Sequence, residues 1–257
     1  MPDASDVVLV EERDGVQIVT LNRPQARNAI NRAVSEAVQA AMDELDARPD
    51  LAVGVITGAG GTFCAGMDLK AFVAGEDVFV QPRGFAGITS VPAKKPLIAA
   101  VEGWALAGGC EIALSCDMVV AAEDAQFGIP EVKRGLVAGA GGLLRLPKKI
   151  PVAIAYELAL TGDPLTAKAA HALGMVNALT PKGGALDGAL ALAARLQPNG
   201  PLAMSVTKQI LDFAVEHTVE EGWELQRSVL PAVFASNDAR EGATAFAEKR
   251  PPRWTAT

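Results

Sequence analysis

The stretch PLIAAVEGWALAGGCEIALSCDMVVAA, residues 96–122, decides the fold class of this chain. Residues 96–102 are mostly apolar and stop at a glycine, which predicts a buried strand. A glycine-rich turn over residues 103–109 follows, then a short helix over residues 111–116 and a further buried strand over residues 118–122. A strand, a glycine turn and a helix in this order indicate an α/β protein, in which helices cover a sheet.

The N-terminal part of the chain repeats this alternation. Strands are predicted over residues 7–12 and 16–21, joined by a tight turn at Asp14-Gly15. A helical pattern begins at Asn31, a residue that suits the N-cap, and another apolar strand covers residues 51–57. The first 150 residues therefore carry more strands than a simple βαβ repeat would.

Beyond Pro151 the pattern becomes helical. Prolines and glycines separate the predicted helices, which cover residues 153–160, 166–173, 185–196, 201–216 and 219–233. Their many alanines suit packing on the core or on another subunit.

Residues 71–91 interrupt the regular pattern. Glycines, prolines and charged residues break every periodicity there. We expect a mobile loop over a site, with a plain surface excursion as the alternative.

Composition excludes several classes of protein. With 30 acidic and 23 basic residues the net charge is −7, which disfavours nucleic-acid binding because such a surface needs clustered Lys and Arg. The N-terminus lacks the apolar core of a secretory signal, and no run of 18 apolar residues could span a membrane. The three cysteines show no CxxC spacing, so we expect small buried thiols and a cytoplasmic protein.

Two glutamates close segments rich in glycine or proline. Glu111 ends Gly108-Gly109-Cys110-Glu111, and Glu131 ends Phe127-Gly128-Ile129-Pro130-Glu131. Buried carboxylates are costly, so this placement suggests proton transfer with a pKa near working pH. The alternative for Glu111 is a carboxylate that only offsets the helix dipole, and for Glu131 it is a salt bridge with Lys133 or Arg134.

Glycines near these carboxylates expose backbone N–H groups that could stabilise an oxyanion. Gly66 frees the turn over residues 64–69, so that the Met67 N–H could point into a cavity. Gly108 and Gly109 open a helix whose N-terminal end attracts anions. The loop at residues 139–142 is too rich in glycine to be only a helix cap.

Other chemistries fit the sequence less well. No glycine run is followed by the lysine and the serine or threonine of a phosphate-binding P-loop. The only histidines, His171 and His217, fall in predicted helices, so we expect structural roles for them and no metal site. The pattern therefore favours proton transfer beside an oxyanion.

Five motifs in order resemble those of the crotonase family, the enoyl-CoA hydratase/isomerase superfamily, over nearly the whole chain. They are Asn22-Arg23-Pro24 with Asn28-Ala29, Ala65-Gly66-Met67-Asp68-Leu69, Gly108-Gly109-Cys110-Glu111, Phe127-Gly128-Ile129-Pro130-Glu131 and Phe246-Ala247-Glu248-Lys249-Arg250. The resemblance implies a spiral of ββα units over residues 1–195, which holds the active site, and a helical trimerisation region over residues 196–257. It also implies a homotrimer or a dimer of trimers.

The resemblance implies an acyl-CoA thioester as substrate and no separate cofactor, because coenzyme A enters as part of that substrate. The backbone N–H groups of Met67 and Gly108 would form the oxyanion hole. Glu111 would act as base toward water, Glu131 would donate a proton to C2, and Gly139 would help to place the water. Contacts with the substrate and its CoA are implied for Ala26, Arg27, Ala29, Ala65, Gly66, Asp68, Leu69 and Lys70, with Lys249 reaching the CoA of a neighbouring subunit.

The presence of both glutamates favours hydration or dehydration within this family. Residues 67–70, 84–87, 144–148 and 247–250 with Trp254 look more like the carnitinyl-CoA dehydratase branch, which is the alternative to an enoyl-CoA hydratase. The chain departs from the hydratase pattern at Met67, Trp104 and Ala138. An acyl-CoA binder without activity is disfavoured, because a binder has no need of the two glutamates.

Overall fold

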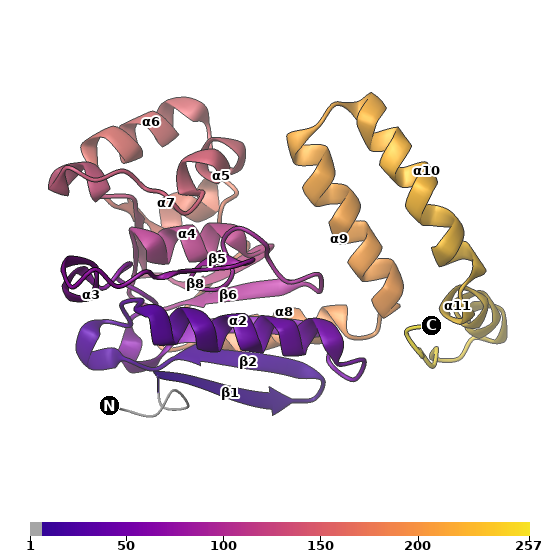
Figure 1. Cartoon of the computed structure of the whole chain (residues 1–257). Coiled ribbons are helices and arrows are strands. Elements are labelled where there is room, and N and C mark those ends of the chain that lie inside the picture. Colours follow the sequence, from indigo (N-terminus) through magenta and orange to yellow (C-terminus); the bar gives the residue numbers. More distant parts are fainter. Residues whose placement is uncertain (1–6) are drawn as a thin grey trace.

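The computed structural model describes residues 7–257 and shows an α/β protein around a six-stranded sheet (Figure 1). The strand order is β1-β2-β3-β6-β8-β11; β1 is antiparallel to β2, and all later neighbours are parallel. These strands are β1 (Val8–Arg13), β2 (Val16–Leu21), β3 (Val53–Gly58), β6 (Leu97–Val101), β8 (Met118–Ala122) and β11 (Ala178–Thr180). The predicted α/β class is confirmed.

Shorter strands form a second sheet and a small ribbon. The second sheet has the order β10-β9-β7, and the ribbon pairs β4 with β5. Because β6 leads into β7 and β8 into β9, each of these pairs gives one strand to each of the two larger sheets. The short strands are β4 (Phe79–Val80), β5 (Gly84–Phe85), β7 (Trp104–Leu106), β9 (Gln126–Gly128) and β10 (Leu165–Thr166).

Helices α2 (Arg32–Ala47) and α8 (Ala185–Leu196) cover opposite faces of the large sheet. Val19 of β2 packs in the cluster that includes α2, whereas its neighbour Ile18 packs in the cluster that includes α8. This alternation follows from the two-residue period of a strand. As predicted, Asn31 caps α2, because its side chain accepts a hydrogen bond from the Val34 N–H at 3.1 Å.

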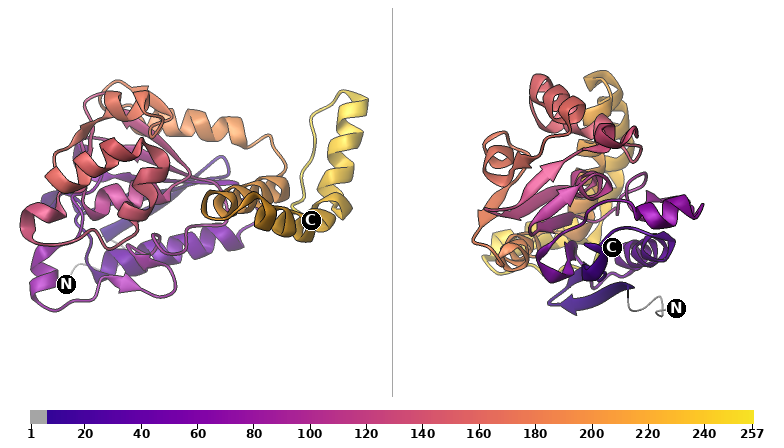
Figure 2. Two further views of the ribbon diagram at one scale, coloured as in Figure 1. Left: turned by 90° about the horizontal axis from the view of Figure 1, so that it is seen from above. Right: turned by 90° about the vertical axis from the view of Figure 1, so that its left-hand side faces the viewer.

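The last three helices form an arm that extends away from the core (Figure 2). Lys208 of the arm ties it to the core, because its Nζ lies 2.7 Å from Asp117 Oδ2 and 3.1 Å from the Lys95 carbonyl. The predicted boundary between residues 195 and 196 falls in the last turn of α8. The arm consists of α9 (Pro201–Glu216), α10 (Val219–Ala235) and α11 (Asn237–Glu248).

The remaining helices are short. They are η1 (Pro24–Ala26), η2 (Ala59–Gly61), α3 (Leu69–Val73), α4 (Gly108–Ser115), η3 (Glu131–Arg134), α5 (Gly142–Lys149), α6 (Val152–Thr161) and α7 (Ala167–Ala172). None of the helices described in residues 7–257 is both long and apolar enough to cross a membrane. Cys64, Cys110 and Cys116 are free and buried, which confirms the prediction for their side chains.

The structure differs from the expectation at several places, and β11 of the large sheet is one element without a predicted counterpart. Residues 71–91 are not one continuous loop, because they contain the end of α3, the β4–β5 ribbon and a buried stretch from Arg83 to Thr89. Arg83 holds this stretch on α2, since its Nε and Nη2 each lie 2.8 Å from a carboxylate oxygen of Asp43 and Asp46 respectively. Helices α5 and α11 have no counterpart among the predicted elements.

Candidate active site

A pocket of about 490 Å³ lies beside the N-terminal end of α4. Its wall joins residues of the 64–85 segment, the β7–α4 turn, η3 and the loop that precedes α5. Most of its apolar lining comes from Met67, Leu69, Phe72, Val78, Phe79, Phe85, Leu106, Leu136 and Val137. Such a mostly apolar pocket with a few charged groups is the usual setting for binding a small molecule.

The structure brings most of the predicted site residues together. Those that line the pocket are Arg27, Ala65, Met67, Leu69, Gly108, Glu111, Glu131 and Gly139. Those that do not line it are Ala26, Ala29, Gly66, Asp68, Lys70 and Lys249. Lys249 lies in the arm, where it ends α11 in a left-handed conformation.

Glu111 lies in the first turn of α4 and is only 3% exposed. Its Oε1 accepts hydrogen bonds from the backbone N–H groups of Ala140 and Gly142, each at 2.8 Å. A Cβ added to Gly142 would lie 2.8 Å from Glu111 Cγ, so only glycine allows this approach. The carboxylate therefore binds another segment of the chain and does more than offset the dipole of its own helix.

Glu131 lies at the start of η3 and is half-buried. Within the described residues its Oε2 is buried and has no hydrogen-bond partner. The alternative of a salt bridge with Lys133 is wrong, because Lys133 Nζ lies 2.6 Å from Asp163 Oδ1 instead. Arg134 lines the same pocket and acts on Glu131 only through its charge.

The two carboxyl groups have different protonation preferences. Burial raises the pKa of Glu131 to about 7, and the nearby charge of Glu111 contributes to this rise. Burial also raises the pKa of Glu111, but the N–H groups of Gly142 and Ala140 and the charge of Arg145 oppose that rise. Burial therefore favours the protonated form of Glu131, whereas the N–H groups and the charge of Arg145 favour the ionised form of Glu111.

Two backbone N–H groups beside the pocket, those of Met67 and Gly108, could bind an anion. The backbone hydrogen bonds of residues 7–257 leave the N–H groups of Met67 and Gly108 without an acceptor. Ala107, directly before Gly108, has φ 51° and ψ −128°, a conformation that residues with a side chain rarely adopt. A Cβ added to Gly66 would lie 3.0 Å from the Gly108 nitrogen, so the turn before Met67 packs directly on the start of α4.

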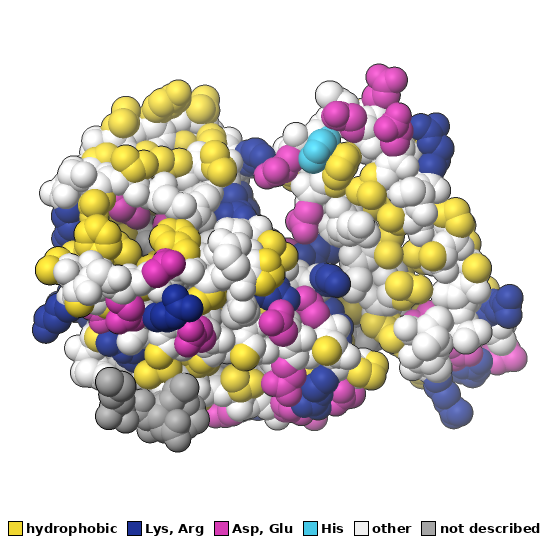
Figure 3. Space-filling model, in the orientation of Figure 1, with side chains coloured by type: hydrophobic (Ala, Val, Ile, Leu, Met, Phe, Trp, Pro, Cys, Tyr) yellow, Lys and Arg dark blue, Asp and Glu magenta, His cyan; other side chains and the backbone are white. Residues whose placement is uncertain are grey.

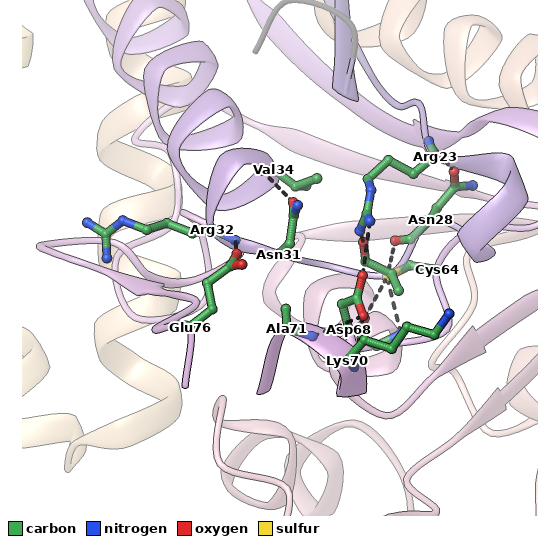
Figure 4. Close-up of polar contacts among 12 residues, drawn as sticks. Arg23, Asn28, Asn31, Arg32, Val34, Cys64, Asp68, Lys70, Ala71 and Glu76 are labelled. Carbon is green, nitrogen blue, oxygen red and sulfur yellow. Dashed lines mark hydrogen bonds and ion pairs between the residues drawn. The ribbon is translucent and has the colours of Figure 1, made fainter. Parts of the chain in front are cut away.

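An ion pair on the side away from the pocket wall stabilises the turn that carries Met67 (Figure 4). Arg23 Nη2 lies 3.0 Å from Asp68 Oδ2, and Asp68 Oδ1 accepts a hydrogen bond from the Lys70 N–H at 3.0 Å. The Arg23 N–H also donates to Asn28 Oδ1 at 2.9 Å. The structure thus gives Asp68 a role in holding the turn, away from the pocket wall.

Sequence reasoning missed which amides of the 139–142 loop bind a carboxylate. Gly139 lines the pocket, but the N–H groups of its neighbours Ala140 and Gly142 bind Glu111. The many glycines of this loop are the only sequence signal that it has a special role. Its partner Glu111 lies 29 residues before Ala140, so no local sequence pattern connects the two.

Known proteins are similar to this chain over nearly its whole length. The model of a family described as Enoyl-CoA hydratase/isomerase matches residues 11–257. The chain is 61% identical to the crystal structure of enoyl-CoA hydratase EchA1 from Mycobacterium marinum, with a TM-score of 0.96 and coverage of 98% of this chain and 100% of that one. A carnitinyl-CoA hydratase from Mycobacterium avium is 45% identical, with a TM-score of 0.79 and coverage of 98% and 99%. A carnitinyl-CoA dehydratase from Salmonella paratyphi B is 44% identical over 244 residues, which are 92% of this chain and 93% of that protein.

Replacing Glu111 by Gln is expected to lower the pKa of Glu131 from about 7, because the charge of Glu111 helps to raise it. Burial is the larger cause, so the pKa should stay above the ordinary value of 4.5. NMR titration of 13C-labelled glutamate carboxyl groups measures this change, with the exposed Glu157→Gln as a control that should have no effect. An unchanged Glu131 titration in Glu111→Gln would show that the two groups are not coupled.

Proposed function

The chain belongs to the enoyl-CoA hydratase/isomerase family, and we propose that it catalyses the reversible addition of water to the double bond of 2,3-enoyl-CoA thioesters. One observation carries this proposal. Glu111 and Glu131 face one apolar pocket in different protonation environments, together with the unpartnered N–H groups of Met67 and Gly108. Hydration of an enoyl thioester needs these three functions: a base, an acid and an oxyanion hole.

In the proposed reaction the thioester oxygen accepts hydrogen bonds from Met67 and Gly108. Glu111 takes a proton from water as the water oxygen attacks C3, and the displaced electron pair moves onto the thioester oxygen as an enolate. The enolate returns that pair to C2, where Glu131 supplies the proton. Gly139, which precedes the loop amides that bind Glu111, would help to place the water.

The magnitudes of these effects suit such a reaction. One amide donor in an oxyanion hole is worth about 2.7–4 kcal/mol of transition-state stabilisation. A positioned acid or base contributes roughly 10²–10⁴-fold to the rate. Because the reaction needs one proton on the pair, activity should fall at low pH as Glu111 is protonated and above about pH 7 as Glu131 loses its proton.

We propose that the CoA part of the substrate binds along residues 26–29 and 65–70. Arg27 and Leu69 line the pocket, and Lys70, which follows Leu69 in the sequence, is exposed. The two cations suit the phosphate groups of CoA. Ala26, Ala29, Ala65 and Gly66 would supply backbone and small side chains along the same path.

Dehydration of carnitinyl-CoA is the second candidate function. Besides the similarity to carnitinyl-CoA enzymes, the pocket wall includes Glu76 and Asp77, which could attract the quaternary ammonium group of such a substrate. The Glu76 carboxylate is already bound to the Arg32 N–H (Figure 4). The 61% identity to the Mycobacterium marinum enoyl-CoA hydratase, against 45% to the carnitinyl-CoA hydratase, favours the first candidate, whereas the phenylalanines at the wall suit either substrate because aromatic rings also bind quaternary ammonium groups.

The arm is proposed to mediate assembly into a homotrimer or a dimer of trimers. Large apolar side chains on it face solvent in the single chain, with Phe234 71% and Phe246 88% exposed. Apolar side chains also gather over α6 and along α9 and α10 in the space-filling view (Figure 3). Exposed apolar surface of this kind is expected where chains associate. Lys249, at the end of the arm, would then reach the CoA of a neighbouring subunit.

Glu111→Gln and Glu131→Gln should each lower kcat for crotonyl-CoA by roughly 10²–10⁴-fold, because Gln can neither accept nor donate the required proton. Loss of the absorbance of the enoyl thioester measures the rate, and circular dichroism checks the fold. The exposed Glu157→Gln is the matched control and should keep the wild-type rate. Near wild-type rates in both site variants would refute the catalytic assignment.

With a panel of thioesters, kcat/KM should be higher for crotonyl-CoA than for carnitinyl-CoA. Asp77→Asn should leave the value for crotonyl-CoA unchanged, because an uncharged acyl chain has no attraction to this carboxylate. If carnitinyl-CoA is the better substrate and Asp77→Asn weakens it selectively, the second candidate function is the correct one.

Light scattering during size-exclusion chromatography should give the mass of three or six chains. Phe246→Glu places a charge at a residue that is 88% exposed in the single chain and should shift the mass toward that of one chain. Val10→Glu, on the β1 edge and outside the arm, is the control and should keep the assembly. A single-chain mass for the unaltered protein would rule out the proposed assembly.

A further inference from the structure

We propose that Arg145 is a positioning residue: it holds the loop whose N–H groups bind the Glu111 carboxylate, and it favours the ionised form of that carboxylate. Arg145 is itself held by the buried segment of residues 84–90, through the Thr89 carbonyl. This inference rests on the proposed function, because it concerns the base of the same site. Arg145 does not line the pocket, and although it falls in the 144–148 stretch noted in the sequence, no site role was predicted for it.

Arg145 contacts the loop whose N–H groups bind Glu111. Its Nη1 lies 3.5 Å from the Ala140 carbonyl, and its Nη2 lies 2.6 Å from the Thr89 carbonyl. A Cβ added to Gly141 would lie 2.3 Å from Nη1, so the guanidinium packs directly against the loop. The backbone of Ala140 is thus held twice, at its N–H by Glu111 and at its carbonyl by Arg145.

Arg145 also acts on Glu111 through its charge. Charged groups near Glu111 come from two elements: Arg145 of α5 carries an opposite charge, and Glu131 of η3 becomes a like charge once it loses its proton. The neighbouring Cys110 thiol stays neutral, because burial raises its pKa to about 12. Arg145 is therefore the cation that favours the ionised form of Glu111.

Other charges around Arg145 come from its own helix and from the arm. Burial lowers the pKa of Arg145, while Glu216 and Asp212 of α9 and Glu111 oppose that effect. Lys149, on the same helix, is a like charge whose pKa is lowered by burial first and by Arg145 to a smaller extent. Because a guanidinium stays protonated at neutral pH, these groups leave its charge intact.

The anchor of Arg145 also supports the oxyanion hole. Thr89 belongs to the buried stretch that contains Phe85, and a Cβ added to Gly108 would lie 2.5 Å from the Phe85 ring. A Cβ added to Gly87 would lie 2.3 Å from the Ser35 carbonyl of α2, which shows how tightly the stretch is packed. Residues 84–90 therefore support Gly108 directly and Glu111 through Arg145.

The test compares Arg145→Gln, Arg145→Lys and Lys148→Gln. Lys148 is the matched control, because it is a cation of the same helix whose Nζ pairs with Glu216, 3.0 Å away. Each variant is studied by NMR titration of Glu111 in the free protein, by the pH dependence of kcat for crotonyl-CoA, and by thermal unfolding.

Arg145→Gln should raise the pKa of Glu111 and move the acid limb of the kcat profile in the same direction, toward higher pH, because the variant removes the nearby positive charge. At neutral pH its kcat should fall on the order of 10- to 100-fold with little change in KM, because the loop loses its support. Arg145→Lys keeps the charge but lacks the two-pronged contact, so it should keep the wild-type pKa of Glu111 with a reduced kcat. Lys148→Gln should change neither quantity.

An unshifted acid limb in Arg145→Gln, with only a lower unfolding temperature, would overturn the inference by showing a merely structural role. A wild-type kcat in Arg145→Gln would overturn it as well. The NMR titration of Glu111 does not depend on turnover. If the unaltered protein fails to hydrate any enoyl-CoA, the proposed function fails, whereas the effect of Arg145 on Glu111 can still be measured.

Discussion

The binding of one Glu111 oxygen by two backbone N–H groups is the interaction on which the site depends. A carboxylate that is 3% exposed would lose its charge without such donors. The donors belong to a loop that can approach only because residue 142 is glycine. Glu131, which faces the same pocket, has a buried oxygen that no described donor reaches. The surroundings thereby give two chemically identical side chains different hydrogen bonding and different protonation preferences.

The second constraint is the close approach of glycine-rich segments. Gly66 packs against the start of α4, and Ala107 is held there in a strained conformation by hydrogen bonds at its nitrogen and its oxygen. The N–H groups of Met67 and Gly108 are thus oriented by the folded chain before any ligand binds. Preorganised donors of this kind need no rearrangement during reaction, which is the main source of their effect.

Much of this arrangement could be predicted from the chain alone, because its determinants are local. The Asp14-Gly15 turn, the Asn31 cap and the apolar strands each leave a short-range pattern, and all of them are present in the structure. The buried stretch around Phe85 could not be predicted, because its order depends on Arg83 binding two carboxylates 37 to 40 residues away. Helix α5 was hidden because it begins with glycine and contains Pro147. The partnership of Glu111 with the loop amides likewise exists only in three dimensions.

The desolvation of Glu131 also makes the free energy of unfolding depend on pH. Its pKa is about 7 in the folded chain and 4.5 in a model peptide, so the unfolded chain releases this proton at a lower pH. The contribution of Glu131 to folding is complete below pH 4.5 and is lost as the pH rises through 7. Selection for resistance to heat at alkaline pH alone would therefore replace this side chain with a neutral one.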